Sequence, residues 1–219
     1  MTKRQGTAAR AESGHRAGLT PGAVARAALG LLADKGADGV SVRGTAERLG
    51  VRMNTVLWHA KTKTRLLELM ADAIVAEIPL DGLPADPRAR VRELLSRYRA
   101  VLLAHRDGAR IVAGTYAAEP ATLRFAEALT AALLQGPRGE REAAWTAWDL
   151  LYFVLGLTQE EQSVPAADDT RLDRAVAAGD YSSLRRLAPH LRDTSFDGRF
   201  AHGLDLLLGP DADQRHAQP

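Results

Sequence analysis

The fold of this chain is decided by residues 20–63, TPGAVARAALGLLADKGADGVSVRGTAERLGVRMNTVLWHAKTK. This stretch predicts three short helices, the last two separated by a tight Leu-Gly-Val turn at residues 49–51. Thr20 can cap the first helix with its hydroxyl, and Pro21 suits the first helical position because no amide hydrogen is needed there. Three short helices with a tight turn before the third are typical of a helix-turn-helix, which lays its second motif helix in the major groove of DNA.

The next helices also have local start and stop signals. Ser41 can cap a second helix that ends near Leu49, and Gly50 permits the sharp turn that follows. The third helix is predicted over residues 53–59. A longer fourth helix is predicted over residues 63–78, because apolar side chains recur there on one face at helical spacing.

The composition favours an all-α fold. Ala and Leu dominate, aromatic residues make up 5% of the chain, and no run alternates β-branched and polar residues as a strand does. The sequence holds no cysteine, which excludes disulfides, thiolate chemistry and Cys-based metal sites. The first residues lack the apolar core of a signal peptide, and no window approaches the length of a membrane span. We therefore expect a cytoplasmic protein that makes no membrane contact.

The charges are distributed unevenly along the chain. Residues 1–80 hold 12 Lys and Arg against 7 Asp and Glu, whereas residues 81–219 hold 17 against 20. A basic first third suits a polyanionic partner such as DNA, although a split of this size also arises by chance in many proteins. The charge pattern is therefore weak support for the helix-turn-helix.

The chain divides into two folded parts, because a cluster of proline and glycine after the fourth helix marks a domain boundary. The basic N-terminal arm is either inert or able to enter the minor groove of DNA. We expect a flexible arm over residues 1–18, a helix-turn-helix domain over 19–65 with its connecting helix reaching about residue 79, a second helical domain over 80–209, and a flexible tail over 210–219.

The second domain is predicted to contain five or six helices. The helix over residues 140–162 is apolar on almost every side, so it must be buried in the core or against a partner. Residues 164–180 are acidic and Ala-rich, and they form either a loop or a marginal helix. The other predicted helices cover residues 86–106, 107–115, 119–134, 181–192 and 195–208.

The helices over residues 140–162 and 195–208 indicate how the chain assembles, because both carry long apolar faces. They form either an internal core or a dimer interface. A helix-turn-helix dimer needs two recognition helices about 34–36 Å apart to match one turn of DNA. Two helices from each subunit can form a four-helix bundle that holds them at this spacing. We therefore expect a homodimer on double-stranded operator DNA.

Two collinear sets of residues point to a known family. The first set is Ala28-Leu29, Leu32, Gly36, Arg43, Ala46, Leu49-Gly50-Val51, Thr55, Trp58-His59, Lys61 and Lys63. The second set is Arg106-Asp107-Gly108-Ala109, Gly114-Thr115, Leu155-Gly156, Glu160, Gln162, Phe200 and Gly203-Leu204. Together they resemble TetR-type repressors, with a second domain similar to the tetracycline-repressor subgroup. The resemblance implies an all-α dimer that binds a palindromic operator and is released by a small-molecule effector bound in its ligand-binding and dimerisation domain.

The resemblance implies DNA contacts around the third helix, where early residues reach base edges and flanking ones hold phosphates. Asn54 could pair with adenine, and Arg52 with guanine or a phosphate. Trp58 is predicted to orient the helix by packing in preference to contacting a base, and His59 is either a phosphate contact or a helix C-cap. Leu57 replaces a phosphate-binding tyrosine common in the family, so the operator differs or other contacts compensate. The predicted DNA-contacting residues are Arg43, Arg52, Met53, Asn54, Thr55, Trp58, His59, Lys61 and Lys63.

The resemblance also implies an effector site. The subgroup's founder binds a magnesium–drug complex through a histidine that matches Val112, and a second ligand histidine matches Ile78 or Pro79. Valine cannot coordinate a metal, and Glu160, which matches an outer-shell carboxylate, makes no metal site alone. We therefore predict no metal, no cofactor and no response to magnesium–tetracycline, but an apolar or aromatic ligand. The predicted ligand-binding residues are Ile78, Tyr98, Val112, Thr115, Tyr116, Trp148, Tyr152 and Glu160.

Each ligand assignment has a structural alternative. Aromatic side chains at helical spacing are more often core than ligand site, and an inward Arg99 or Glu160 can equally form a structural ion pair. The expected function is that of a ligand-responsive repressor. The alternatives are an activator of the same fold or a regulator controlled by a protein partner. An enzyme is not expected, because the sequence contains no G-x-S-x-G, H-E-x-x-H or phosphate-loop motif.

Overall fold

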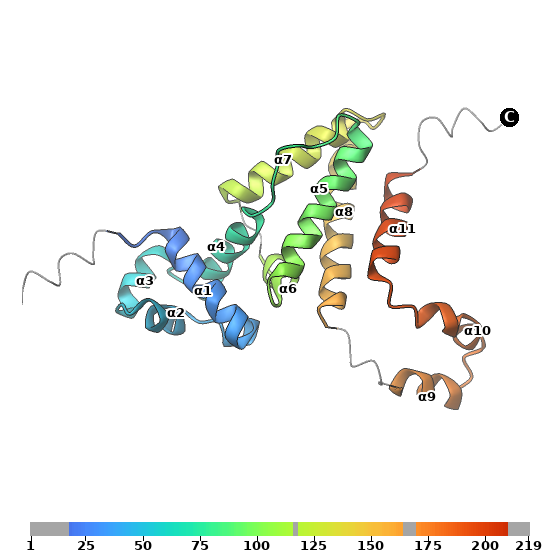
Figure 1. The fold of residues 1–219 in the computed structure, drawn as a ribbon, viewed down its shortest axis with the longest axis horizontal. Helices are drawn as coiled ribbons and strands as arrows, with labels where there is room; N and C mark the ends of the chain where they lie inside the picture. The colour runs from blue at the N-terminus through green and yellow to red at the C-terminus, as the bar shows by residue number, and fades with distance from the viewer. Residues whose placement is uncertain (1–17, 116–117, 164–169, 210–219) are drawn as a thin grey trace, which may run out of the picture.

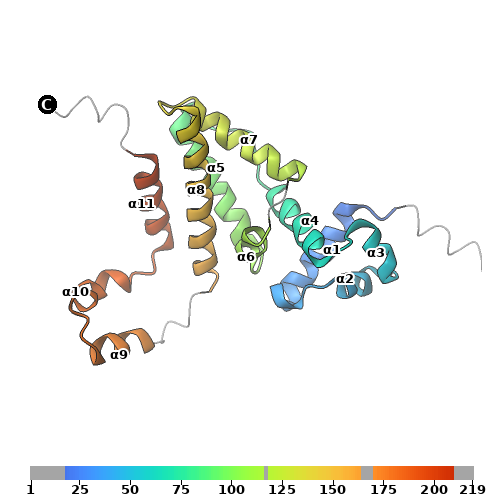
Figure 2. The same cartoon turned by 180° about the vertical axis from the view of Figure 1, so that it is seen from behind.

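The computed structural model describes residues 18–115, 118–163 and 170–209. In these ranges the chain forms eleven α-helices and one short 3₁₀ helix, with no strand, so the predicted all-α fold is confirmed (Figures 1 and 2). None of the helices described is both long and apolar enough to cross a bilayer. The predicted arm and tail lie outside the described residues, apart from Gly18.

The N-terminal block, residues 18–62, begins as its local signals predicted. The Thr20 hydroxyl accepts a hydrogen bond from the Ala23 amide at 3.2 Å, and the Ser41 hydroxyl accepts one from the Gly44 amide at 3.0 Å. Gly50 adopts a left-handed conformation with φ of 65°, which ends the second helix and starts the turn. The elements are α1 (Pro21–Lys35), the 3₁₀ helix η1 (Ala37–Gly39), α2 (Val42–Leu49) and α3 (Met53–His59).

Helix α4 (Lys63–Val75) connects the N-terminal block to the rest of the chain and packs against α1. The sequence predicted that it reaches Ile78, and this boundary is wrong. The amides of Glu77 and Ile78 bond three residues back, to Ile74 and Val75, which tightens the last turn into 3₁₀ geometry. The next residue is Pro79, which disfavours helical geometry at the residue before it.

The helical body consists of α5 to α8 together with α11. Helix α8 lies between α5 and α11, and α6 and α7 pack across α4 (Figure 1). A single hydrophobic core runs from Val24 in α1 to Leu208 in α11, so the block and the body share one packed interior. The body's elements are α5 (Pro87–Ala104), α6 (Gly108–Ala113), α7 (Pro120–Leu134), α8 (Glu140–Glu161) and α11 (Phe196–Leu208).

Helices α9 (Arg171–Ala178) and α10 (Ser182–Leu191) extend away from the body in both views (Figures 1 and 2). Neither helix has a buried residue. For the described part of residues 164–180, the open choice between loop and helix resolves to a helix. Leucines on these helices, including Leu172, Leu187 and Leu191, are exposed.

The apolar sequence of α8 predicts burial on most sides, either in the core or against a partner. Within this subunit, only one face of α8 is buried. One face carries Ala147, Leu150 and Val154 into the core. The opposite face exposes 58% of Trp145 and 62% of Tyr152 to solvent. A helix that is apolar all round needs cover on both sides, so burial inside this subunit explains only one face of α8.

Candidate functional site

The first candidate surface lies at the start of α3, where the chain leaves the left-handed turn. Arg52 is the N-cap residue of α3, and Arg52, Met53 and Asn54 are all exposed. Thr55 is half-buried. The next residue, Val56, is completely buried and packs the helix against the block. Local packing therefore leaves the guanidinium of Arg52, the thioether of Met53 and the amide of Asn54 exposed together at the N-terminal end of α3.

Arg43 lies on the exposed side of α2. Its Nε lies 2.9 Å from Oε1 of Glu47, one helical turn further on. Both side chains are largely exposed, and such i,i+4 pairs contribute only about 0.3–0.5 kcal/mol. Arg43 can therefore exchange this partner for a phosphate at little energetic cost.

Trp58 does not pack against the block. Its side chain is 82% exposed, so the predicted packing role is wrong for this chain. The neighbouring residues differ, because Leu57 and His59 are half-buried and Ala60 is fully buried. The sequence alone could not show this, since exposure of an aromatic ring depends on which elements lie opposite it.

Two lysines follow α3 and extend the same surface. Lys61 and Lys63 are exposed, and Lys63 is the first residue of α4. The hydrogen bond and charge of the Arg110 guanidinium lower the pKa of the Asp38 carboxyl, and the positive charge of Lys63 acts in the same direction. The structure thus places the nine predicted DNA-contacting residues on or beside α2, α3 and the start of α4.

The predicted ligand residues do not gather in one place. Tyr98 and Ile78 are buried in the core, and the Tyr98 ring stacks on Phe125 with 4.9 Å between centroids. Burial raises the pKa of the Tyr98 hydroxyl above its ordinary value. Val112 and Thr115 are half-buried at the end of α6, where the Thr115 hydroxyl donates to the Val112 carbonyl at 3.0 Å. Tyr116 lies outside the described residues.

The other predicted ligand residues lie on the outer side of α8. Trp148 and Tyr152 are exposed and stack on each other with 5.6 Å between centroids. Glu160 is also exposed, and its Oε1 lies 3.6 Å from the Arg199 guanidinium of α11. Within the ranges the structure describes, no three histidine or acidic side chains gather as metal ligands would. The ligand roles of all these residues, and the lack of a magnesium site, stay predictions.

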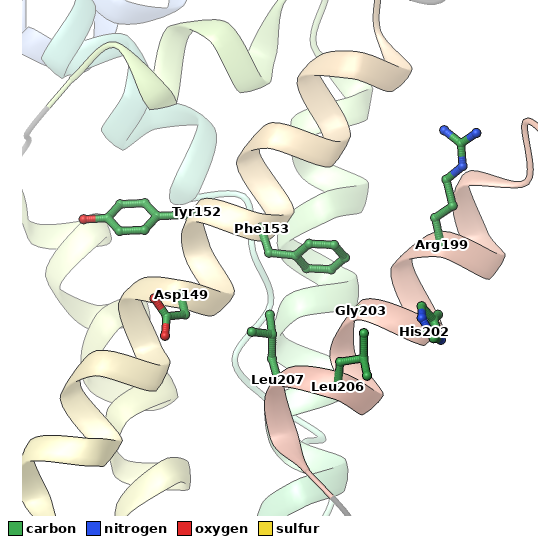
Figure 3. Close-up of a pocket in the computed structure, with 8 residues that line it drawn as sticks. All are labelled: Asp149, Tyr152, Phe153, Arg199, His202, Gly203, Leu206 and Leu207. Atoms are coloured by element: carbon green, nitrogen blue, oxygen red, sulfur yellow. The ribbon is translucent and has the colours of Figure 1, made fainter. Parts of the chain in front are cut away.

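A shallow groove of about 500 Å³ lies between the outer sides of α8 and α11 (Figure 3). Its lining is mainly apolar and includes Tyr152, Phe153, Leu206 and Leu207. The Phe153 ring points across it toward Gly203, where a Cβ atom would lie 2.1 Å from the ring. Glycine at this position therefore allows the close approach of α11 to α8.

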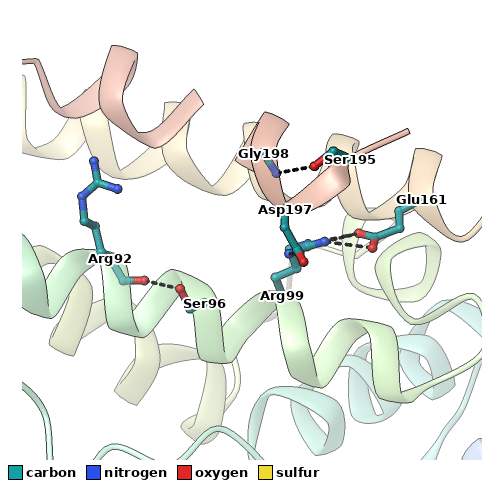
Figure 4. Close-up of polar contacts among 7 residues, drawn as sticks. All are labelled: Arg92, Ser96, Arg99, Glu161, Ser195, Asp197 and Gly198. Atoms are coloured by element: carbon teal, nitrogen blue, oxygen red, sulfur yellow. Dashed lines mark hydrogen bonds and ion pairs between the residues drawn. The ribbon is translucent and has the colours of Figure 1, made fainter. Parts of the chain in front are cut away.

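Arg99 is the buried charge that the sequence left open between ligand contact and ion pair. The structure favours the ion pair (Figure 4). Its guanidinium binds Glu161 of α8 through two nitrogens, at 3.0 and 2.8 Å, and Asp197 of α11 at 2.6 Å. The sequence alone did not identify Glu161 and Asp197 as partners, because they lie 62 and 98 residues from Arg99 along the chain.

The exposed start of α3, set behind α2 and a left-handed turn, defines a helix-turn-helix transcriptional regulator joined to a larger helical domain. The chain belongs to the tetR family of bacterial regulatory proteins. The model of that family's N-terminal domain matches residues 24–70, and the model of the tetracyclin repressor-like C-terminal domain matches residues 82–209.

Individual relatives agree with this assignment. The chain is 34% identical to the tetracycline repressor protein class A from transposon 1721 of Escherichia coli, over 90% of this chain and 92% of that protein. It is similar to the structure of the TetR family protein ActR from Streptomyces coelicolor in complex with actinorhodin, with a TM-score of 0.77 and 26% identity over 88% of this chain and 94% of that one. It is also similar to BioQ with its natural double-stranded DNA operator, with a TM-score of 0.60 and 26% identity over 84% of this chain and all of that one.

Proposed function

We propose that this regulator is a repressor that binds a palindromic operator as a homodimer and is released by a small apolar or aromatic ligand. The observation that carries the proposal is the open end of α3, where Arg52, Met53 and Asn54 are exposed together beside the exposed ring of Trp58. Residues of this kind at the start of a recognition helix reach base edges in the major groove.

The two kinds of DNA contact come from different parts of the surface. Asn54 suits adenine, and Arg52 suits guanine or a phosphate. Arg43, Lys61 and Lys63 flank the helix and suit phosphates, which position a protein on DNA without selecting sequence. The structure of the relative BioQ on its operator supports this use of the fold.

The outer face of α8 and α11 is the proposed dimer interface, where a second copy of this chain binds. Trp145, Trp148 and Tyr152 form a continuous exposed stripe on α8, and Leu206 of α11 is exposed beside the groove. A twofold interface pairs such a patch with itself. We therefore assign Trp148 and Tyr152 to dimerisation in preference to ligand contact.

The proposed effector site lies on the inner side of the body, around Ile78, Tyr98, Val112 and Thr115. Apolar side chains and one phenol ring suit a planar, weakly polar ligand better than a chelated metal. The similar protein ActR has been solved with actinorhodin, which supports an aromatic ligand class. Val112 offers no lone pair to a metal ion, which argues against a magnesium–tetracycline complex.

Helix α4 provides a route from ligand to DNA. It packs against α1 on one side and against α6 and α7 on the other. A ligand that binds better to the state in which the recognition helices do not match DNA shifts the population toward that state. Reversing a strong preference for DNA requires about 10⁴-fold tighter binding to the released state, or about 5.5 kcal/mol.

The test begins with selection of an operator from a pool of random duplexes, followed by anisotropy titrations at several salt concentrations. Arg52→Ala is expected to weaken operator binding about tenfold or more. Arg124→Ala, which removes an exposed arginine of α7, is the matched control and should bind as the unaltered protein does. Failure to enrich any duplex would overturn the proposal.

Release is tested on the selected operator with actinorhodin as a planar aromatic probe and tetracycline with Mg²⁺ as the comparison. The proposal expects that the aromatic probe lowers operator affinity and that magnesium–tetracycline does not. Release by magnesium–tetracycline would overturn the proposed ligand class and leave the DNA-binding part standing.

A further inference from the structure

The short turn that joins α5 to α6, residues 105–107, is hydrogen-bonded directly to the N-terminal block. The carboxylate of Asp107 accepts a hydrogen bond from the backbone amide of Ala37, with 2.7 Å between Oδ2 and N. Ala37 is the first residue of η1 and is buried. Its amide is therefore capped by a side chain 70 residues away, because no residue of the block supplies a side-chain cap for η1.

The turn and the block approach closely at Gly36 of the block and Asp107 of the turn. Gly36 has φ of 72°, and a Cβ atom there would lie 3.0 Å from Oδ2 of Asp107. Asp107 itself has φ of 54° and is, among the described residues, the one non-glycine residue with positive φ. Aspartate is one of the few residues besides glycine that adopt this left-handed conformation readily, so Asp107 suits the turn. The Arg106 guanidinium adds hydrogen bonds of 3.4 and 3.3 Å to the carbonyls of Ala33 and Asp34.

The other side of the turn is held by Gln162, the C-cap residue of α8. Its side-chain amide donates to the carbonyls of Leu102 and His105 at 3.0 and 2.7 Å, and its oxygen accepts from the Ala109 amide at 3.2 Å. Helix ends leave such carbonyls and amides without intrahelical partners. One side chain therefore closes the end of α5 and the start of α6 together.

Glu161, the residue before Gln162, binds Arg99 of α5, which also binds Asp197 of α11 (Figure 4). Two neighbouring residues at the end of α8 thus point in two directions. Glu161 connects α8 to Arg99 of α5, which in turn binds α11, and Gln162 connects α8 to the turn that caps the DNA-binding block.

We infer that Gln162 and Asp107 are positioning residues for operator binding: Gln162 fixes the turn to α8, and Asp107 transmits that position to the block at Ala37. The inference rests on the proposed function, in which α8 forms the dimer interface and α3 binds the operator. The orientation of each recognition helix is then set from the dimer helix through these two side chains, along a path separate from α4.

The test measures hydrogen exchange of the full-length protein by mass spectrometry. Gln162→Ala touches no residue of the block, yet it is expected to speed exchange in peptides covering residues 36–40 about three- to tenfold, with little change over residues 42–49. Gln135→Ala is the matched control, because Gln135 is the C-cap of α7 and has one exposed side-chain bond, to Arg90. It should leave both segments unchanged.

Two further variants separate the cap from backbone strain. Asp107→Gly removes the carboxylate but accepts positive φ freely, so it should speed exchange over residues 36–40 as Gln162→Ala does. Asp107→Asn keeps an oxygen acceptor and tolerates this conformation, so most of the protection should return. If both residues act in one path, the Asp107→Gly, Gln162→Ala double variant exchanges little faster than either single variant.

Unchanged exchange over residues 36–40 in Gln162→Ala would overturn the inference. So would equal acceleration over residues 42–49, which would show general destabilisation, or full additivity in the double variant. Operator affinity of Gln162→Ala is expected to fall at least threefold, whereas that of Gln135→Ala is unchanged. If the unaltered protein bound no operator, the proposed function would fail, while the exchange result would still decide whether the path exists.

Discussion

The guanidinium of Arg99 and the carboxylate of Glu161 form a bidentate ion pair between α5 and α8, with 3.0 Å from Nε to Oε2 and 2.8 Å from Nη2 to Oε1. The two side chains are 11% and 22% exposed. This geometry matches the planar fork of arginine to a carboxylate, which gives direction as well as energy. The pair therefore orients the end of α8.

Removing the cation of this pair should destabilise the protein. Arg99→Ala leaves Glu161 desolvated without its partner, and we expect a loss of about 2–3 kcal/mol in the free energy of unfolding, less than for a fully buried pair because water reaches Glu161. Urea denaturation measures this loss. Arg43→Ala removes the solvent-exposed pair with Glu47 and should cost no more than about 0.5 kcal/mol. Equal losses for the two variants would contradict the structural role of Arg99.

Trp58 should matter for DNA binding and not for stability. Because its ring is almost entirely exposed, Trp58→Ala should change the free energy of unfolding by no more than about 0.5 kcal/mol. Its loss from the operator-facing surface should weaken binding about fivefold or more. Denaturation and anisotropy on the same preparation measure both effects. A large loss of stability would restore the packing role that the structure rejects.

The outer face of α8 and α11 should be needed for dimerisation. Leu206→Asp places a charge in the groove beside α8 and should give the monomer mass by light scattering at about 10 μM, because a twofold interface buries the charge twice. Leu123→Asp is the matched control, since Leu123 on α7 is also exposed but lies outside this face. Dimers from both variants, or monomers from both, would count against the proposed interface.

Tyr98 should make the protein sensitive to alkali. Burial raises the pKa of its hydroxyl above the ordinary value of 10.0, so the folded state holds this proton more tightly than the unfolded chain. The stabilising contribution is complete below pH 10 and decreases as pH rises toward the folded-state pKa, by up to about 1.4 kcal/mol per pH unit.

The measurement compares urea denaturation at pH 8 and pH 11. Tyr98→Phe should lose less stability over this interval than the unaltered protein. Tyr181→Phe, which alters an exposed tyrosine, should lose as much as the unaltered protein does. Identical behaviour of the two variants would show that Tyr98 does not titrate as a buried group.

The sequence by itself determined the helices and the fold class, because the signals that mark them act over a few residues. The caps at Thr20 and Ser41 each close on an amide three residues ahead. The left-handed turn needs only Gly50. At the end of α4 the predicted boundary was three residues too late, because the apolar spacing continues to Ile78 whereas the last amides form 3₁₀ hydrogen bonds.

Only the tertiary structure decided which residues share a site. The sequence placed Tyr98 and Tyr152 in one ligand set, but the first lies in the core and the second faces outward on α8. It could not connect Gln162 to the turn before α6, or Asp107 to Ala37, because these contacts join segments 53 to 70 residues apart. A cap depends on its neighbours in the chain, whereas exposure and long-range hydrogen bonds depend on how whole helices pack. For that reason the caps and the turn around α3 could be predicted from the sequence, whereas the exposure of Trp58 and the hydrogen bonds between the block and the body could not.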